Sequence, residues 1–225
     1  MKFVPCNLCG SNASRELYPA TKIDTSTPSN GSAFLCTSPD YGTHYRIVQC
    51  AECGFAYANP RGEAADVIRA YESVEDPLYL RERIGREITF RKHLKRMHRF
   101  TGKPDGRRLL DVGAYTGVFV EAANLAGWNA EGIEPSGWAV REARKLGLAV
   151  TQGTLATGGY GENSFDAITL WDVIEHFDDP QTELRQVLRL LKPGGVAVIH
   201  TIDIDSPTAK MMGRRWPFLM EMHIM

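Results

Sequence analysis

Leu109-Leu-Asp-Val-Gly-Ala-Tyr-Thr-Gly117 is the stretch of this sequence that decides the fold. It begins as a short apolar strand pattern, passes through a turn with glycines at 113 and 117, and continues into the apolar helical pattern of residues 118–125. A strand, a glycine turn and a helix in this order are typical of an open parallel sheet, in which ligands bind beyond the carboxyl ends of the strands. The segment therefore predicts a ligand site at the turn.

Short apolar segments alternate with amphipathic ones along the rest of the chain from Arg107 onward. Alternation of this kind predicts a Rossmann-like α/β domain, whose parallel sheet is covered by helices on both faces. The expected strands are residues 108–112, 130–133, 149–151, 167–170 and 196–201. The expected helices are residues 118–125, 137–146 and 182–191.

Spacing and charge at the glycine turn indicate which cofactor it binds. Gly113 and Gly117 follow a Gly-x-x-x-Gly pattern, whereas a backbone that approaches a pyrophosphate carries Gly-x-Gly-x-x-Gly. Asp111, at the end of the strand, would repel a pyrophosphate but attract the ammonium and sulfonium groups of S-adenosylmethionine. The turn thus favours this cationic cofactor over a dinucleotide.

Two further segments fit an adenosine ligand. Glu134 ends the second strand, 21 residues after Gly113 (134 − 113), and a carboxylate there accepts hydrogen bonds from ribose hydroxyls. Thr154 and Leu155 follow the third strand and are expected against the adenine. For Asp111 and Glu134, the capping of a helix or turn is the alternative role. The complete set expected at the cofactor is Asp111, Gly113, Ala114, Tyr115, Gly117, Glu134, Pro135, Thr154, Leu155, Trp171 and Asp172.

Four segments of this domain together resemble the ordered motifs of class I methyltransferases. They are Asp111 to Gly117, Gly132-Ile-Glu-Pro-Ser136, Phe165 to His176, and Leu191-Lys-Pro-Gly-Gly195. The resemblance covers residues 108–201 and implies an enzyme that uses S-adenosylmethionine. One departure is Tyr115, which stands where the first motif usually has a glycine.

Two Cys-x-x-Cys-Gly knuckles precede the α/β domain, one from Cys6 to Gly10 and one from Cys50 to Gly54. Two intervening residues let both thiolates reach one ion, and the glycine lets the chain curve behind it. Four thiolates form a closed tetrahedral zinc site, which is structural. Disulfides and redox cysteines are the alternatives, but a reducing compartment disfavours the first and duplicate knuckles the second. We therefore expect structural zinc on Cys6, Cys9, Cys50 and Cys53.

A cysteine-ligated zinc module followed by a class I methyltransferase domain resembles a family that includes sugar C-methyltransferases of deoxysugar biosynthesis. Related enzymes of that family occur in polysaccharide gene clusters. The resemblance covers nearly the whole chain and implies a nucleotide-sugar or glycan precursor as the methyl acceptor. It places Tyr71 where a substrate-contacting tyrosine is expected, and it places an active-site Glu and His near Glu221 and His223.

Methyl transfer requires a group that takes up the proton of the acceptor. His176 follows the fourth strand at the ligand-binding edge, and the ordinary pKa of histidine, about 6.5, suits a base at neutral pH. Capping of the local helix, or pairing with Glu175, is the alternative role of His176. Tyr71 and His223 are the further catalytic candidates, while Asp172 is expected to position the cofactor.

Composition limits the location and the partners of the protein. The chain has 225 residues, of which 43% are hydrophobic and 24% charged, and its formal net charge is −1. No apolar run approaches the roughly 18 residues that a membrane span requires. The first residues also lack the apolar core of a secretory signal. We therefore predict a cytoplasmic protein without a membrane partner.

A basic helical segment raises the main alternative function. Residues 81–99 carry eight Arg and Lys against two Glu, which suits an RNA methyltransferase. The near-neutral total charge and the lack of a stacked-aromatic platform argue against nucleic acid. The sequence Leu-Trp-Asp-Val after the fourth strand also differs from the Asn/Asp-Pro-Pro-Tyr of base-amine methylation. A non-catalytic binder of the cofactor or of a protein partner is the second alternative.

The sequence predicts three consecutive parts. These are a zinc-binding module over residues 1–60, a helical linker and substrate cover over 61–103, and the S-adenosylmethionine-binding domain over 104–225. Only 24 residues (225 − 201) follow the fifth strand, so we expect a fragment whose sheet is incomplete at its C-terminal side. The apolar face expected on the linker helix consists of Ile84, Ile88, Leu94 and Met97.

Overall fold

The computed structural model describes residues 1–22, 35–37 and 42–225. The chain divides into two compact units, each assembled from separate parts of the sequence. Unit 1 consists of Met1–Tyr71, Ile174–Gln181 and Thr201–Met225, and unit 2 of Glu72–Val173 and Thr182–His200. The three consecutive parts expected from the sequence stay a prediction.

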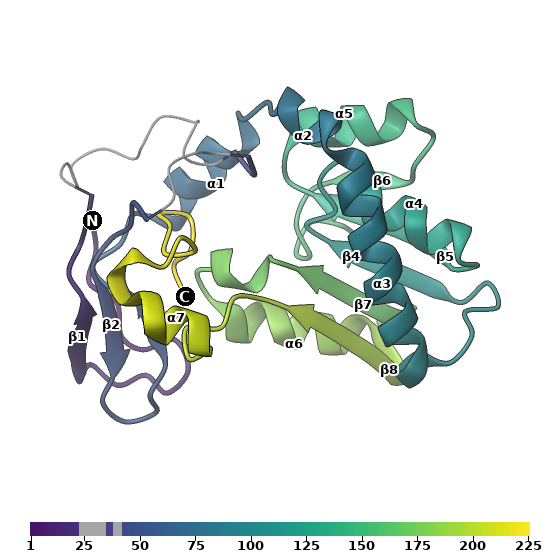
Figure 1. The fold of residues 1–225 in the computed structure, drawn as a ribbon. Coiled ribbons are helices and arrows are strands. Elements are labelled where there is room, and N and C mark those ends of the chain that lie inside the picture. Colours follow the sequence, from purple (N-terminus) through teal and green to yellow (C-terminus); the bar gives the residue numbers. More distant parts are fainter. Residues whose placement is uncertain (23–34, 38–41) are drawn as a thin grey trace. The chain divides into compact units, whose positions relative to one another are not determined.

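Unit 2 contains the α/β domain (Figure 1). Its strands are β4 (Arg108–Val112), β5 (Asn129–Glu134), β6 (Val150–Gln152), β7 (Phe165–Trp171) and β8 (Leu191–His200). Its helices are α2 (Pro77–Arg81), α3 (Arg83–Thr101), α4 (Val118–Leu125), α5 (Gly137–Lys145) and α6 (Pro180–Leu190), the last beginning in unit 1.

The five strands form one parallel sheet in the order β6-β5-β4-β7-β8, which confirms the predicted Rossmann-like α/β architecture. From β4 the chain first builds outward through β5 and β6, and then returns to place β7 on the other side of β4. The strand order therefore reverses between β4 and β7. Ligands of open α/β sheets bind at such a reversal, beyond the carboxyl ends of the strands.

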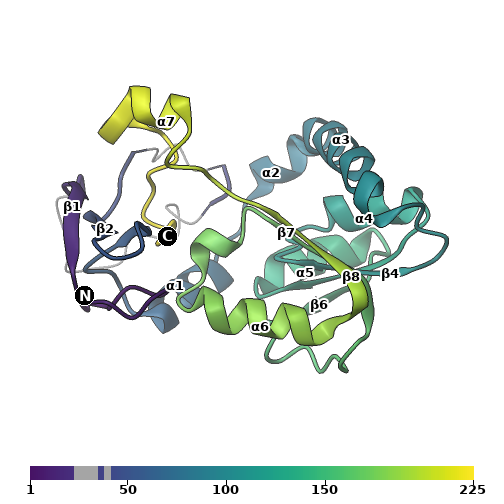
Figure 2. The ribbon, with the colours of Figure 1, turned by 90° about the horizontal axis from the view of Figure 1, so that it is seen from below.

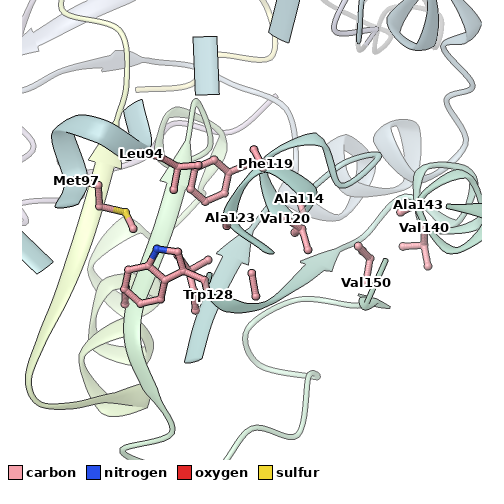
Figure 3. Close-up of a cluster of buried hydrophobic side chains, with 14 residues drawn as sticks. Leu94, Met97, Ala114, Phe119, Val120, Ala123, Trp128, Val140, Ala143 and Val150 are labelled. Atoms are coloured by element: carbon pink, nitrogen blue, oxygen red, sulfur yellow. The ribbon is translucent and has the colours of Figure 1, made fainter. Parts of the chain in front are cut away.

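Helices cover both faces of this sheet. Helix α6 lies on one face, and α3 and α4 lie on the other (Figure 2). A cluster of buried side chains fills the layer beneath α3 and α4, and Figure 3 shows it with Leu94, Phe119 and Trp128 among its members. This core fixes α4 directly behind the glycine turn, since Phe119 and Val120 of its first turn are almost completely buried.

The expected apolar face of α3 is half wrong. Leu94 and Met97 are 3% exposed, but Ile84 and Ile88 are 73% and 53% exposed. At 100° per residue, Phe90, Leu94 and Met97 share one side of the helix, and the two isoleucines point about 110–155° away from it. The packed face therefore consists of Phe90, Leu94 and Met97.

The expected ends of several elements also differ from the structure. The strand predicted from residue 196 begins at Leu191, and the helix predicted from residue 182 begins at Pro180. Proline fits the first turn of a helix because its missing N–H has no partner there. The remaining predicted strands and helices of the domain agree with the structure to within two residues.

Unit 1 contains a small antiparallel sheet, in the order β1-β2-β3. Its strands are β1 (Ser14–Tyr18), β2 (Ile47–Cys50) and β3 (Ala56–Ala58). The remaining elements of this unit are α1 (Ala64–Glu72), which ends one residue inside unit 2, η2 (Ile174–His176), α7 (Pro207–Met212) and η3 (Gly213–Arg215).

The C-terminal segment of the chain completes the core of unit 1. Trp216, Leu219 and Ile224 pack with Tyr45 and Ile47 of the N-terminal part. The backbone N–H of Ala58 also donates to the carbonyl of Ile224 at 3.1 Å. Residues that are far apart in the sequence thus build one unit. Among the described residues, no helix has the length and apolar character that a membrane crossing requires.

The two sides of α3 give a direct test of its packing. We expect Leu94→Ala to lower the free energy of unfolding by about 2–5 kcal/mol, because it removes a buried side chain from the core of unit 2. Ile84→Ala, on the exposed side of the same helix, should change it by less than about 0.5 kcal/mol. Denaturant unfolding followed by tryptophan fluorescence measures both. Equal losses in the two variants would contradict the observed orientation of α3.

Candidate cofactor and metal sites

The glycine turn after β4 adopts a conformation that few residue types accept. Gly113 and Gly117 have φ angles of 68° and 74°. A Cβ on Gly113 would lie 2.6 Å from Cγ2 of Val173, so only glycine fits this position. Tyr115, which replaces the usual middle glycine, also has a positive φ of 47°. The turn therefore keeps the left-handed geometry of glycine at a residue with a large side chain.

Glu134 fastens this turn to the end of β5. One carboxylate oxygen accepts the backbone N–H of Tyr115 at 2.9 Å, and the other accepts that of Ser136 at 2.7 Å. The residue is completely buried. The alternative role of Glu134 at a turn is thus present in the structure. A carboxylate accepts hydrogen bonds, so a side chain at this position suits N–H and hydroxyl donors.

Asp111 is a buried acid next to this turn. Its side chain is 2% exposed and accepts a hydrogen bond from Oγ1 of Thr169 at 2.6 Å. The pKa of Asp111 is raised to about 8, mainly by burial and also by the negative charge of Glu134, while the hydrogen bond from the Thr169 hydroxyl acts in the opposite direction. The carboxyl groups of two neighbouring strands therefore meet at one end of the sheet, where a cation would relieve their repulsion.

Aromatic rings surround Tyr115. Its ring meets Tyr79 of α2 edge to face at 4.4 Å and lies 5.9 Å from Trp138 of α5. The guanidinium of Arg86 sits 3.8 Å from the centre of the Tyr79 ring. Sequence reasoning missed Tyr79 and Trp138. The Asp76-Pro77 helix start was an available signal, because the Asp76 side chain accepts the backbone N–H of Tyr79 at 3.1 Å.

The other residues expected at the cofactor also belong to unit 2. Leu155 is buried, and the backbone N–H of Thr154 donates to Oγ1 of Thr157 at 2.9 Å. The carbonyl of Pro135 accepts from the side chain of Gln152 at 3.3 Å. These contacts order the ends of β5 and β6, next to the glycine turn in the strand order.

Trp171 ends β7, on the other side of β4, and Asp172 follows it. The Trp171 ring lies 5.0 Å from that of Phe119 and 4.8 Å from that of His93. Asp172 has a positive φ of 54°, and its carboxylate pairs with Nδ1 of His200 at 2.8 Å. Sequence reasoning did not anticipate His200, which ends β8.

The predicted catalytic residues belong to the other unit. Tyr71, His176 and His223 are all half-buried members of unit 1. The rings of His176 and His223 are 5.1 Å apart, which brings together two residues separated by 47 positions (223 − 176). Glu175, the alternative partner of His176, is buried beside them.

Glu221, which the family resemblance placed near the active site, has a different environment in unit 1. Its Oε1 accepts from Nζ of Lys22 at 2.6 Å and from the hydroxyl of Tyr45 at 2.7 Å. Burial, followed by this hydrogen bond, raises the pKa of Tyr45. The contacts make Glu221 part of a buried ion pair that joins the C-terminal segment to the N-terminal part of the unit.

The four cysteines of the two knuckles converge in unit 1. Their sulfur atoms all lie within 4.8 Å of one another, with Cys6 and Cys53 3.5 Å apart and Cys9 and Cys50 also 3.5 Å apart. A tetrahedron with metal–sulfur bonds of about 2.3 Å has edges of roughly 3.8 Å, and a disulfide would need about 2.05 Å. The thiols are free, and their spacing resembles the ligand shell of a metal.

The two knuckles also share one backbone geometry. In each, the glycine N–H donates to the carbonyl of the first cysteine, at 2.8 Å in Gly10 and 3.1 Å in Gly54. Both glycines have a positive φ, 75° and 79° respectively. The chain therefore curves in the same way behind each pair of sulfurs, as the sequence predicted. Cys36, the fifth cysteine, is exposed and lies outside this cluster.

Comparison with known proteins agrees with the geometry of unit 2. The sequence model of the family described as "Methyltransferase domain" (Methyltransf_23) matches residues 81–225. A solved structure, a SAM dependent methyltransferase from Archaeoglobus fulgidus, superimposes with a TM-score of 0.50 at 18% identity, over 60% of this chain and 63% of the other. At that identity the superposition shows the fold alone.

Curated relatives cover a smaller part of the chain. A ubiquinone biosynthesis O-methyltransferase of Bordetella avium is 33% identical over 119 residues, which are 49% of this chain and 48% of the relative. One of Ralstonia nicotianae is 35% identical over 104 residues, 43% of this chain and 44% of the relative. This chain thus spans about half the length of the curated relatives it matches.

The raised pKa of Asp111 predicts a pH dependence of stability. Between about pH 4 and pH 8 the folded chain keeps the Asp111 proton, whereas an unfolded chain, with the ordinary pKa of 3.8, releases it. Unfolding then releases a proton, so raising the pH lowers the free energy of unfolding. Asp111→Asn removes this contribution, and its unfolding free energy should fall less over the same range.

Denaturant unfolding at several pH values across that range measures the slope, with Asp105→Asn in an exposed loop as the matched control. The control should keep the slope of the original chain. If Asp111→Asn keeps it too, the buried carboxyl does not hold its proton in the folded state.

Proposed function

Because this chain belongs to the methyltransferase-domain family whose model matches residues 81–225, we propose that it transfers the methyl group of S-adenosylmethionine to a small-molecule acceptor. The observation that carries the proposal is the pair of buried acids at the carboxyl ends of the adjacent strands β4 and β5, Asp111 and Glu134. It lies at the reversal of strand order, where open α/β sheets bind their ligands.

The residues present fit this cofactor by their chemistry. Asp111 is an acid held largely uncharged by burial, and a nearby cation would favour its charged form. We assign Glu134 to the ribose hydroxyls, because an acid at the end of the second strand of such a sheet accepts hydrogen bonds from them. Gly113 lets the backbone of the turn pass close to the side chain of Val173, which a Cβ would prevent. When bound, the cofactor supplies a methyl group already activated by its sulfonium.

The remaining cofactor residues have roles that follow from their positions. Ala114 and Tyr115 form part of the turn, and the ring of Tyr115 packs against Tyr79 and Trp138. Trp171 and Asp172 stand at the end of β7, across β4 from Glu134. We assign Asp172 to positioning of the cofactor, with His200 holding its carboxylate.

The chain's own part in the chemical step is to align the acceptor and remove its proton. We propose His176, with Tyr71 and His223 as further candidates, for the proton. The carbonyl of Met222 accepts from Nδ1 of His176, so the other ring nitrogen carries the lone pair that a base requires. A methyl acceptor with a hydroxyl group fits this chemistry.

We propose a small molecule as the methyl acceptor and, more specifically, a nucleotide-sugar or glycan precursor. A small molecule agrees with the relatives, whose names describe O-methyltransferases of ubiquinone biosynthesis; those names apply to the relatives. A nucleotide-sugar or glycan precursor rests on the sequence resemblance of the two-part organisation, and the comparisons add no support to it. A screen of both acceptor classes and of RNA with labelled cofactor separates these options from a non-catalytic binder.

We also propose that Cys6, Cys9, Cys50 and Cys53 bind one structural zinc ion. The sulfur spacing of 3.5 Å and the repeated glycine geometry support it. Cys6 and Cys50 are buried with Val48 and Tyr57 in a small core that the metal would complete. Free thiols require a reducing compartment, in line with the predicted cytoplasmic location.

Glu134 allows the cofactor proposal to be tested by binding. We expect S-adenosylhomocysteine to bind the chain, and Glu134→Ala to weaken the binding by about 10- to 100-fold, because hydrogen bonds to a charged group contribute about 1.5–3 kcal/mol each. Isothermal titration calorimetry measures both affinities.

Glu131→Ala on the same strand is the matched control, because Glu131 pairs with Arg108 near the opposite end of the strand pair. It should leave the affinity unchanged. NAD should not bind, and tight binding of NAD would overturn the charge argument based on Asp111.

The zinc proposal predicts a tightly held metal. After dialysis against a weak chelator, elemental analysis should find one zinc ion per chain, and Cys9→Ser should lose it and destabilise unit 1. Structural zinc sites contribute on the order of 10 kcal/mol to such modules. Cys36→Ser, at the exposed fifth cysteine, should keep the zinc. A metal-free chain with disulfides between the cysteines of the knuckles would contradict the proposal.

A further inference from the structure

A second group of metal-ligating side chains occurs in unit 1, separate from the cysteines. Glu175 and His176 of η2 and His223 of the C-terminal segment each offer one ligand atom, and these atoms lie within 4.8 Å of one another. Glu175 is 1% exposed, and the two histidines are half-buried. Two imidazoles and one carboxylate are a donor set that first-row transition metals bind.

The orientation of both rings is fixed by backbone carbonyls. Nδ1 of His176 lies 2.8 Å from the carbonyl oxygen of Met222, and Nδ1 of His223 lies 2.7 Å from that of Phe218. A carbonyl only accepts, so both Nδ1 atoms are the protonated donors, and the second nitrogen of each ring keeps its lone pair. This arrangement, with one ring N–H on a carbonyl, is usual for histidines that bind a metal.

The carboxylate of Glu175 is also held by a hydrogen bond. Oγ1 of Thr201 donates to Oε2 of Glu175 at 2.9 Å. The backbone N–H of Ile224 also donates to the carbonyl of Glu175 at 2.9 Å, which ties η2 to the segment that carries His223. All three candidate ligands are therefore held in place by neighbours. Such preorganisation lowers the ordering that metal binding would otherwise require.

We infer that Glu175, His176 and His223 bind one divalent first-row transition metal ion, such as zinc, in a site with open coordination positions. Three protein ligands leave room for an oxygen ligand, as in catalytic zinc sites with two histidines and a glutamate. The closed cysteine site leaves none. The two proposed sites therefore differ in their donor atoms and in whether they leave an open coordination position.

If His176 binds the ion through its second ring nitrogen, that nitrogen cannot also take up a proton, so metal binding and the proposed role of His176 as a base exclude each other while the ion is bound. Metal binding itself does not depend on the methyl-transfer proposal.

Cobalt(II) is the probe for the test. The full chain is first loaded with one equivalent of zinc, which fills the cysteine site, and is then titrated with cobalt(II). We expect one further equivalent to bind per chain, with the weak visible absorption of nitrogen and oxygen ligands and without a thiolate-to-cobalt charge-transfer band. His223→Gln and His176→Gln should each weaken this binding at least tenfold, and His200→Gln in unit 2 should not.

Three results would overturn the metal site: no second equivalent in the original chain, a charge-transfer band that places the cobalt on thiolates, or equal affinity in both histidine variants. Thermal unfolding and circular dichroism check that each variant is folded, and the titration of the original chain decides the question even if one variant is not. Calorimetry with S-adenosylhomocysteine tests the proposed function separately. A chain that binds this ligand but takes up no second metal keeps the methyl-transfer proposal alone.

Discussion

The two hydrogen bonds that the carboxylate of Glu134 accepts fix the cofactor-binding end of the α/β domain. The two carboxylate oxygens accept the backbone N–H groups of Tyr115 and Ser136, so one side chain joins the turn after β4 to the start of α5. Two helices therefore begin at fixed positions beyond neighbouring strands. Burial makes these charge-assisted bonds strong and makes their loss severe, since an unpaired N–H in that position has no water to replace the carboxylate.

The turn held in this way explains why a tyrosine can occupy a glycine position. A left-handed conformation costs a residue with a side chain about 1–2 kcal/mol. At Tyr115 that cost is offset by the hydrogen bond to Glu134 and by ring contacts with Tyr79 and Trp138. Tyr115 thus adds an aromatic side chain to the turn while its backbone keeps a left-handed conformation.

The features predicted correctly depend on residues that are close together in the sequence. Alternating apolar segments predicted the parallel sheet, and glycine spacing predicted the turn after β4 and the curvature behind each pair of cysteines. The face of α3 was predicted half wrong, because Ile84 and Ile88 are apolar but the surface that selects a face belongs to strands and to α4. The contacts of Trp216 and Ile224 with the N-terminal strands were beyond prediction, since they join parts of the chain nearly two hundred residues apart and carry no periodic signal.

Two pairs of buried ionisable side chains differ in the charge of their members. Lys22 and Glu221 form a compensated pair, so their burial in unit 1 serves to hold two chain segments together. Asp111 and Glu134 are both acids, and each makes the charged form of the other less favourable. Their position at the carboxyl ends of adjacent strands fits the proposed site for a cationic ligand, because a positive charge there would offset the repulsion between the two acids.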